Sequence, residues 1–260
     1  MSPAGRMQQA HTTFLTSLPH YPDERIRLAK VVEHLHSCED SAVVGFFSLL
    51  LERAPAHALE ADLLITLVLH RDVLHTTLGQ GRFWAFSTLA HREGEPLTRL
   101  YVRSFVLSTH YAEGRASCER RRYDPHEVPL GVRTETARTT GCQDTLERLL
   151  LDPSARVVQN VLRNVHLREE QVLRILGAPG CNQETVLAVL ADRRWRRRRR
   201  VRISLAGNPH VPLVLAAVLL LTCNRAERRD VLQRASLPMT LVDLITELDR
   251  QSLEPEDRCS

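Results

Sequence analysis

The sequence predicts an all-α protein, an α-solenoid of short helical repeats with an N-terminal helical layer, and three observations support this. Aromatic residues make up only 5% of the 260 residues, so the apolar residues are mainly Leu, Val and Ala, which suit helices better than sheets. Apolar residues recur at helical spacing along most of the chain. From residue 144 onward, short amphipathic segments follow one another with tight breaks, as in repeat proteins.

The chain is expected to fall into five parts. The first is poor in pattern and rich in Gln, Thr, Ser, His and Pro, which is typical of a mobile terminus. The third carries Gly, Pro and charged clusters that break regular structure. The parts are a disordered arm (1–22), an N-terminal helical region (23–112), a linker or irregular layer with a short helix near 132–138 (113–140), helical repeats (141–252) and a disordered tail (253–260).

The N-terminal region begins with a helix opened by Pro22-Asp23-Glu24, because acidic residues stabilise the first turn. Helical spacing then places Ile26, Ala29, Val32 and Leu35 on one apolar face. Further helices are expected at residues 42–53, 59–78, 83–91 and 96–110.

The C-terminal helices show two internal echoes. At an offset of 44, Asn164 matches Asn208 and His166 matches His210, and a shorter echo has an offset of 14. These matches favour stacked repeats, with an irregular helical bundle as the alternative. The expected helices are 144–151, 154–164, 168–177, 182–191, 194–207, 212–222, 225–235 and 239–250.

The apolar faces of these helices are expected to pack together in one core. The positions expected to be buried are Val157, Val161, Val172, Ile175, Val186, Leu190, Val201, Leu205, Leu215 and Leu219.

Five segments carry a resemblance to a known family: 128–133 (VPLGVR), 149–158 (LLLDPSARVV), 162–164 (LRN), 200–202 (RVR) and 208–212 (NPHVP). Through them, residues 126–235 resemble bacterial helical-repeat proteins of the HEAT-like and leucine-rich-repeat-variant type. An Arg-Val step, a helix and an Asn-Pro-type stop recur in such repeats. The resemblance implies a curved helical scaffold and no particular reaction. Some leucine-rich-repeat-variant proteins carry an iron–sulfur domain with clustered cysteines, which this chain lacks.

The basic residues are almost all arginine, 34 against one lysine, and are concentrated in the C-terminal half. Residues 1–130 hold 14 basic and 15 acidic residues, whereas residues 131–260 hold 21 basic and 16 acidic residues, a net charge of +5. The whole chain, at +4, is far from a polycation, so any binding to an acidic partner is expected to involve the C-terminal half.

Eight arginines stand within residues 193–202. On one continuous helix, Trp195, Val201 and Leu205 would face the core and most of the arginines would face solvent. Like charges four residues apart repel by a few tenths of a kcal/mol, so the segment calls for negative charge nearby. The candidate binding residues are Arg193, Arg196, Arg197, Arg200 and Arg202.

Three sources of negative charge stay open: the chain's own acidic residues, an acidic partner protein, or nucleic-acid phosphate. Few aromatic residues lie among the arginines, which argues against single-strand recognition. If the arginines face a partner, replacing Arg196, Arg197 and Arg200 by Gln should leave the melting temperature unchanged or slightly higher. The chain's own candidates are Glu169, Glu170, Glu184 and Asp192.

No catalytic signature survives inspection. His70-Arg71-Asp72 resembles part of a kinase catalytic loop, but the Asn required five residues after the Asp is replaced by Thr77, and there is no P-loop. Cys142 has no identifiable base. A helical-repeat DNA glycosylase would need more aromatics in a basic groove than Trp84 and Trp195 supply.

No metal or cofactor is expected from the sequence. His34, His36 and Cys38 form H-x-H-x-C, in which His34 and Cys38 share a helix face, but further ligands would have to come from elsewhere. The six cysteines are widely spaced without a C-x-x-C pair, so reduced thiols are expected.

The sequence therefore predicts a non-enzymatic cytoplasmic scaffold that binds a protein partner with an acidic surface. The N-terminus lacks the pattern of a secretory signal, and the longest apolar stretch, residues 211–223, is too short for a membrane span of about 20 residues. The alternative is a nucleic-acid-binding helical-repeat module that uses residues 193–202.

Overall fold

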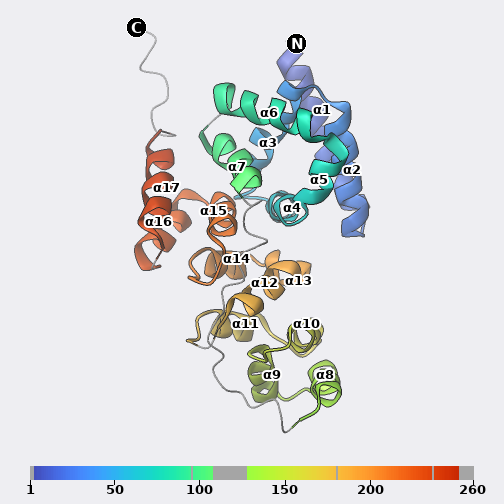
Figure 1. The fold of residues 1–260 in the computed structure, drawn as a ribbon, viewed down its shortest axis with the longest axis vertical. Helices are drawn as coiled ribbons and strands as arrows, with labels where there is room; N and C mark the ends of the chain where they lie inside the picture. The colour runs from blue at the N-terminus through green and yellow to red at the C-terminus, as the bar shows by residue number, and fades with distance from the viewer. Residues whose placement is uncertain (1–2, 95, 108–127, 180, 236, 252–260) are drawn as a thin grey trace.

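The computed structural model describes residues 3–94, 96–107, 128–179, 181–235 and 237–251. These residues form helices and connecting turns, and no strand occurs among them, so the all-α prediction is confirmed. Figure 1 shows helices α1–α7 gathered at one end of the molecule and α8 and α9 at the other.

The first half of the chain contains seven α-helices and a 3₁₀ turn within the described residues. They are α1 (Pro3–Ser17), η1 (Leu18–His20), α2 (Glu24–Ser37), α3 (Asp40–Arg53), α4 (Ala58–Leu69), α5 (Arg71–Leu78), α6 (Gln80–Glu93) and α7 (Pro96–Leu107).

Helix α1 replaces the disordered arm expected at residues 1–22. Its buried side chains, His11 and Leu15, precede the buried Leu18 at helical spacing, and Phe14 packs against the same core. The pattern was missed because a histidine occupies one of its core positions and polar residues surround it. The arm prediction is therefore wrong for residues 3–20.

Two further expectations for this half are corrected. The buried face of α2 contains Leu28 and Val31 besides the expected Val32 and Leu35, whereas Ile26 is 47% exposed. The single helix expected over 59–78 is two helices, because the backbone of His70 leaves the helical region between α4 and α5. Asp23 caps α2 by accepting hydrogen bonds from the backbone of the first turn, as the acidic start of this helix predicts.

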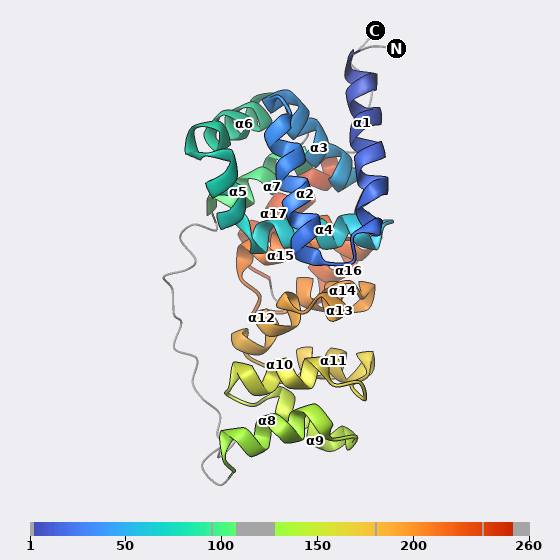
Figure 2. The same ribbon diagram turned by 90° about the vertical axis from the view of Figure 1, so that its right-hand side faces the viewer.

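In the second half, helices follow one another as successive layers (Figure 2), from α8 and α9 through α10 and α11 to α12–α15. The short helix expected near 132–138 is α8, and the linker residues 113–127 and the tail 253–260 lie outside the described residues. The helices are α8 (Leu130–Thr139), α9 (Gln143–Leu150), α10 (Ala155–Arg163), α11 (Glu169–Leu176), α12 (Gln183–Ala191), α13 (Arg193–Arg196), α14 (Arg199–Ala206), α15 (Leu213–Leu221), α16 (Arg225–Arg234) and α17 (Met239–Gln251).

The two halves meet at α15 and α17. Helix α15 is apolar throughout and packs against α14, α7 and α4, while α17 packs against α7. One hydrophobic core therefore runs through both halves. All ten positions that the sequence predicts to be buried, from Val157 to Leu219, lie in this core.

Asn164 and Asn208, matched at the offset of 44, make equivalent hydrogen bonds. The Asn164 side chain is buried and donates to the carbonyls of Ala137 and Thr140 at the end of α8, at 2.9 and 3.0 Å. Asn208 is also buried and donates to the Leu176 carbonyl at the end of α11, at 2.7 Å. Each side-chain oxygen accepts from the backbone N–H two residues later, at 2.8 Å. Both asparagines thus tie the end of an earlier helix to the turn that follows their own helix.

Replacing Asn164 or Asn208 by Ala is expected to cost about 1–3 kcal/mol each, because buried carbonyls lose their donor. Urea denaturation measures the change. Asn160 is the control, since its side chain bonds only within its own helix on an exposed face, so Asn160→Ala should change stability by less than about 0.5 kcal/mol. Equal effects at all three positions would contradict the stabilising role of the buried hydrogen bonds of Asn164 and Asn208.

Candidate functional site

The arginine segment is divided between two helices. Helix α13 ends at Arg196, the backbone of Arg198 is extended, and α14 begins at Arg199. No Pro or Gly marks this break in the sequence, which therefore predicts one continuous helix. The faces expected for the arginines on that helix are wrong because the two helices have different registers. The break turns Arg196 inward, and the expectation that this residue faces solvent is wrong: its side chain is 1% exposed.

Arg196 crosses from α13 to the N-terminal half of the molecule. Its Nε donates to Asp62 Oδ1 on α4 at 2.7 Å, and its Nη2 donates to Thr66 Oγ1 at 2.9 Å and to Glu24 at the start of α2. A charge-assisted pair of this kind is both strong and directional. The partners of Arg196 are thus acidic residues of the other half, and include none of the four internal candidates that the sequence offers for the segment, Glu169, Glu170, Glu184 and Asp192.

Arg202 is the second arginine that the structure places inside. It is 3% exposed, and its Nη1 donates to the carbonyl of Arg197 at 2.9 Å and, more weakly, to that of Arg196. Burial lowers the pKa of its guanidinium. Arg202 thereby satisfies the last carbonyls of α13, so its role is structural, and the expectation that it contributes to a surface site is corrected.

Positive charge exceeds negative charge around Asp62. The Nε atoms of Arg193 and Arg197 lie 3.5 and 3.3 Å from Asp62 Oδ2, and both side chains are partly exposed. Arg27 is buried nearby, and its pKa is lowered by burial and then by the charges of Arg193 and Arg197. The pKa of Arg193 is lowered by burial and by Arg197.

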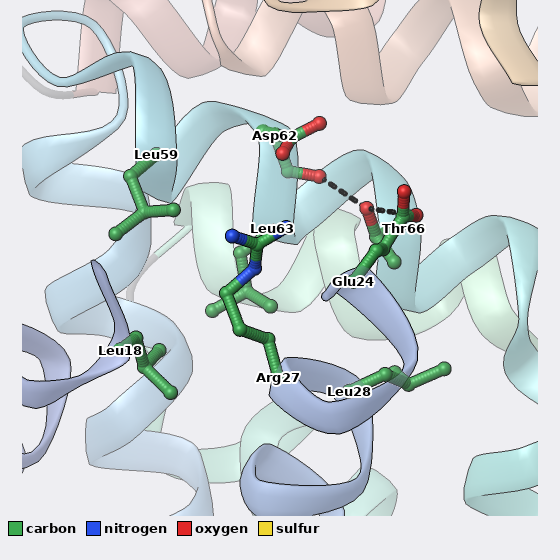
Figure 3. Close-up of a pocket in the computed structure, with 8 residues that line it drawn as sticks. All are labelled: Leu18, Glu24, Arg27, Leu28, Leu59, Asp62, Leu63 and Thr66. Carbon is green, nitrogen blue, oxygen red and sulfur yellow. Dashed lines mark hydrogen bonds between the residues drawn. The ribbon is translucent and has the colours of Figure 1, made fainter. Parts of the chain in front are cut away.

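Figure 3 shows Glu24, Arg27, Asp62 and Thr66 around a small cavity that four leucines also line. Thr66 donates to the Asp62 carbonyl at 2.8 Å, and Glu24 lies within reach of the same hydroxyl. The cavity measures about 10 Å³, which is about the least space that holds one water molecule. The cavity is too small for an organic substrate. The charged residues around it, together with Arg196, instead join the two halves of the molecule.

The exposed arginines lie beyond the break. Arg198, Arg199 and Arg200 are 55, 53 and 65% exposed. Arg198 lies 3.6 Å from Glu169, and Arg200 lies 3.5 Å from Glu170, both on α11. Arg199 forms a closer pair with Glu227 at 2.6 Å, which raises its pKa. Of the candidates named from the sequence, Arg200 is the most exposed. Arg198 and Arg199 are not among those candidates, because one continuous helix does not set them apart from the neighbouring arginines.

The described cysteines are reduced and differ in their exposure. Cys38, Cys142, Cys181 and Cys223 are free, and the other two cysteines lie outside the described residues. Cys142 is exposed at the start of α9, where hydrogen bonding to Thr145 lowers its thiol pKa. Burial raises the pKa of Cys223 to about 12, which makes it an inert apolar side chain.

No family model, no curated protein and no solved structure matches this chain. Within the described ranges, none of the helices is long and apolar enough to cross a bilayer.

Proposed function

We propose that the protein is a non-enzymatic scaffold of stacked helical repeats, and that its exposed arginines bind a protein partner with an acidic surface. The layered order of α8–α15 and the equivalent bonds of Asn164 and Asn208 support the repeat interpretation. The refined binding residues are Arg197, Arg198 and Arg200, with Arg193 at the edge.

A local excess of positive charge carries the proposal. Within the described part of the chain, six of the eight arginines of residues 193–202 form ion pairs with five carboxylates, those of Glu24, Asp62, Glu169, Glu170 and Glu227. The pairs of Arg198 and Arg200 are long and exposed, and such pairs contribute only about 0–1 kcal/mol. A partner's carboxylates can therefore replace Glu169 and Glu170 at little cost to the fold.

The test measures binding of the full chain to immobilised poly-glutamate and, in parallel, to double-stranded DNA at several salt concentrations. Arg198→Gln with Arg200→Gln is expected to weaken poly-glutamate binding roughly 2–30-fold, the combined effect of two exposed charge pairs. The matched control is Arg138→Gln with Arg234→Gln, which removes the same charge from side chains that are 65 and 79% exposed elsewhere.

The control pair should bind like the wild type. Equal losses in both double variants would show that only net charge matters and would contradict a defined site. Tighter binding to DNA than to poly-glutamate, with a steep salt dependence, would instead support the nucleic-acid alternative.

A further inference from the structure

We propose that His11, His34 and Cys38 form a zinc-binding site between α1 and α2, independently of the arginine surface. The sequence places His34 and Cys38 one helical turn apart but supplies no third ligand. Folding of α1 brings His11 to them from a segment 23 residues earlier than His34.

The donor atoms have the spacing that one metal ion requires. His11 Nδ1 lies 3.0 Å from His34 Nε2, Cys38 Sγ lies 3.8 Å from the same nitrogen, and all three donor atoms lie within 4.8 Å of one another. Around a tetrahedral zinc ion with bonds of about 2.0–2.3 Å, two nitrogens are about 3.3 Å apart and a nitrogen and a sulfur about 3.6 Å. The two distances to His34 Nε2 lie within a few tenths of an ångström of these values, and the remaining separation, between His11 and Cys38, is at most 4.8 Å.

Aromatic packing holds both imidazole rings in place. Phe14 stacks on His34, with ring centroids 4.0 Å apart and an angle of 7° between the rings, and Phe46 meets His11 edge-on at 5.4 Å. His11 is 3% exposed. Burial lowers the pKa of both imidazoles, which keeps them neutral, the form that binds metal.

Arg82, on α6, fixes the third ligand. It donates to the backbone carbonyls of His36 and Cys38 and to Asp40 Oδ1, so the turn after α2 is held from outside. Burial raises the pKa of the Cys38 thiol, while Ser37 and then the charge of Arg82 act in the opposite direction. These supporting contacts resemble the outer shell that orients ligands in metal sites.

Binding is a simple exchange of protons for metal. The Cys38 thiol releases its proton to solvent as the sulfur–zinc bond forms. The proton shared between the two imidazoles moves to a ring nitrogen facing away, so that His11 Nδ1 and His34 Nε2 both present lone pairs. Three protein ligands leave a fourth position for water.

The test titrates the full chain, stripped with a chelator, with Zn²⁺ and, in parallel, with Co²⁺. We expect one tight site per chain and a thiolate-to-cobalt charge-transfer band. Cys38→Ser should abolish that band and weaken zinc binding by more than about 100-fold, since even outer-shell partners contribute 10–100-fold. His11→Gln should weaken binding to a similar extent.

Two matched variants keep the test falsifiable. His36→Gln and Cys142→Ser change an exposed histidine of the same helix and an exposed cysteine, and both should bind zinc like the wild type. Absence of the cobalt band in the wild type, or equal binding by wild type and Cys38→Ser, would overturn the site. If Cys38→Ser fails to fold, zinc must still protect Cys38 of the wild type, but not Cys142, from alkylation; no selective protection would also overturn it.

Discussion

Arg196→Gln is expected to lower the free energy of unfolding by about 3 kcal/mol. Removing one partner of a buried ion pair costs about 3–5 kcal/mol, because the remaining charge is left in a poorly solvated place. Asp62 is 4% exposed and would lose its closest cation. The lower end of the range applies, since Arg193 and Arg197 stay within 3.5 Å of the same carboxylate.

Urea denaturation of Arg196→Gln beside Arg200→Gln separates the inner arginine from the outer one. Arg200 and its partner Glu170 are each 65% exposed, so the control should change stability by no more than about 1 kcal/mol. Equal stability of the two variants would show that the bridge to Asp62 contributes little. The triple Gln variant of Arg196, Arg197 and Arg200, expected from the sequence to be neutral, is now expected to be destabilised.

Trp195→Ala is expected to cost about 3–5 kcal/mol, as for other buried large side chains. Trp195 is 1% exposed, and its indole N–H donates to the Leu162 carbonyl at 2.8 Å, which links α13 to α10. Trp195→Phe keeps most of the volume and loses this bond, so an intermediate cost is expected.

The other tryptophan of the chain is a natural control for this experiment. Trp84 is 50% exposed on α6, and Trp84→Ala should change stability by about 0.5 kcal/mol or less. Thermal unfolding followed by circular dichroism compares the two. A melting temperature for Trp195→Ala close to that of Trp84→Ala would contradict the role of Trp195 in joining neighbouring layers.

Apolar spacing predicted the core of the C-terminal half. Val157, Leu205 and the other eight positions each lie on the apolar face of their own helix, and that face is buried. The same reasoning failed at His11, since a buried histidine reads as polar in a hydrophobic pattern. Helix α1 was therefore missed, and with it the third ligand of the proposed zinc site.

The arginine segment failed for a different reason. Its expected faces depended on one unbroken helix, and the extended backbone at Arg198 shifts the register between Arg196 and Arg200. Arg196 then pairs with Asp62, 134 residues earlier. A contact at that separation is set by how the two halves dock, and local spacing carries no information about it.

The bridge from Arg196 to Asp62 also has a consequence in time. During synthesis at roughly 5–20 residues per second, the 134 residues that follow Asp62 up to Arg196 take about 7–27 s to appear. Throughout that interval Asp62 and Glu24 lack their arginine partner from α13. The Asp62 carboxylate on α4 must therefore stay hydrated. Asp62 and Glu24 are therefore covered late in synthesis. If translation stops before residue 196, the released N-terminal half has these two carboxylates exposed to water.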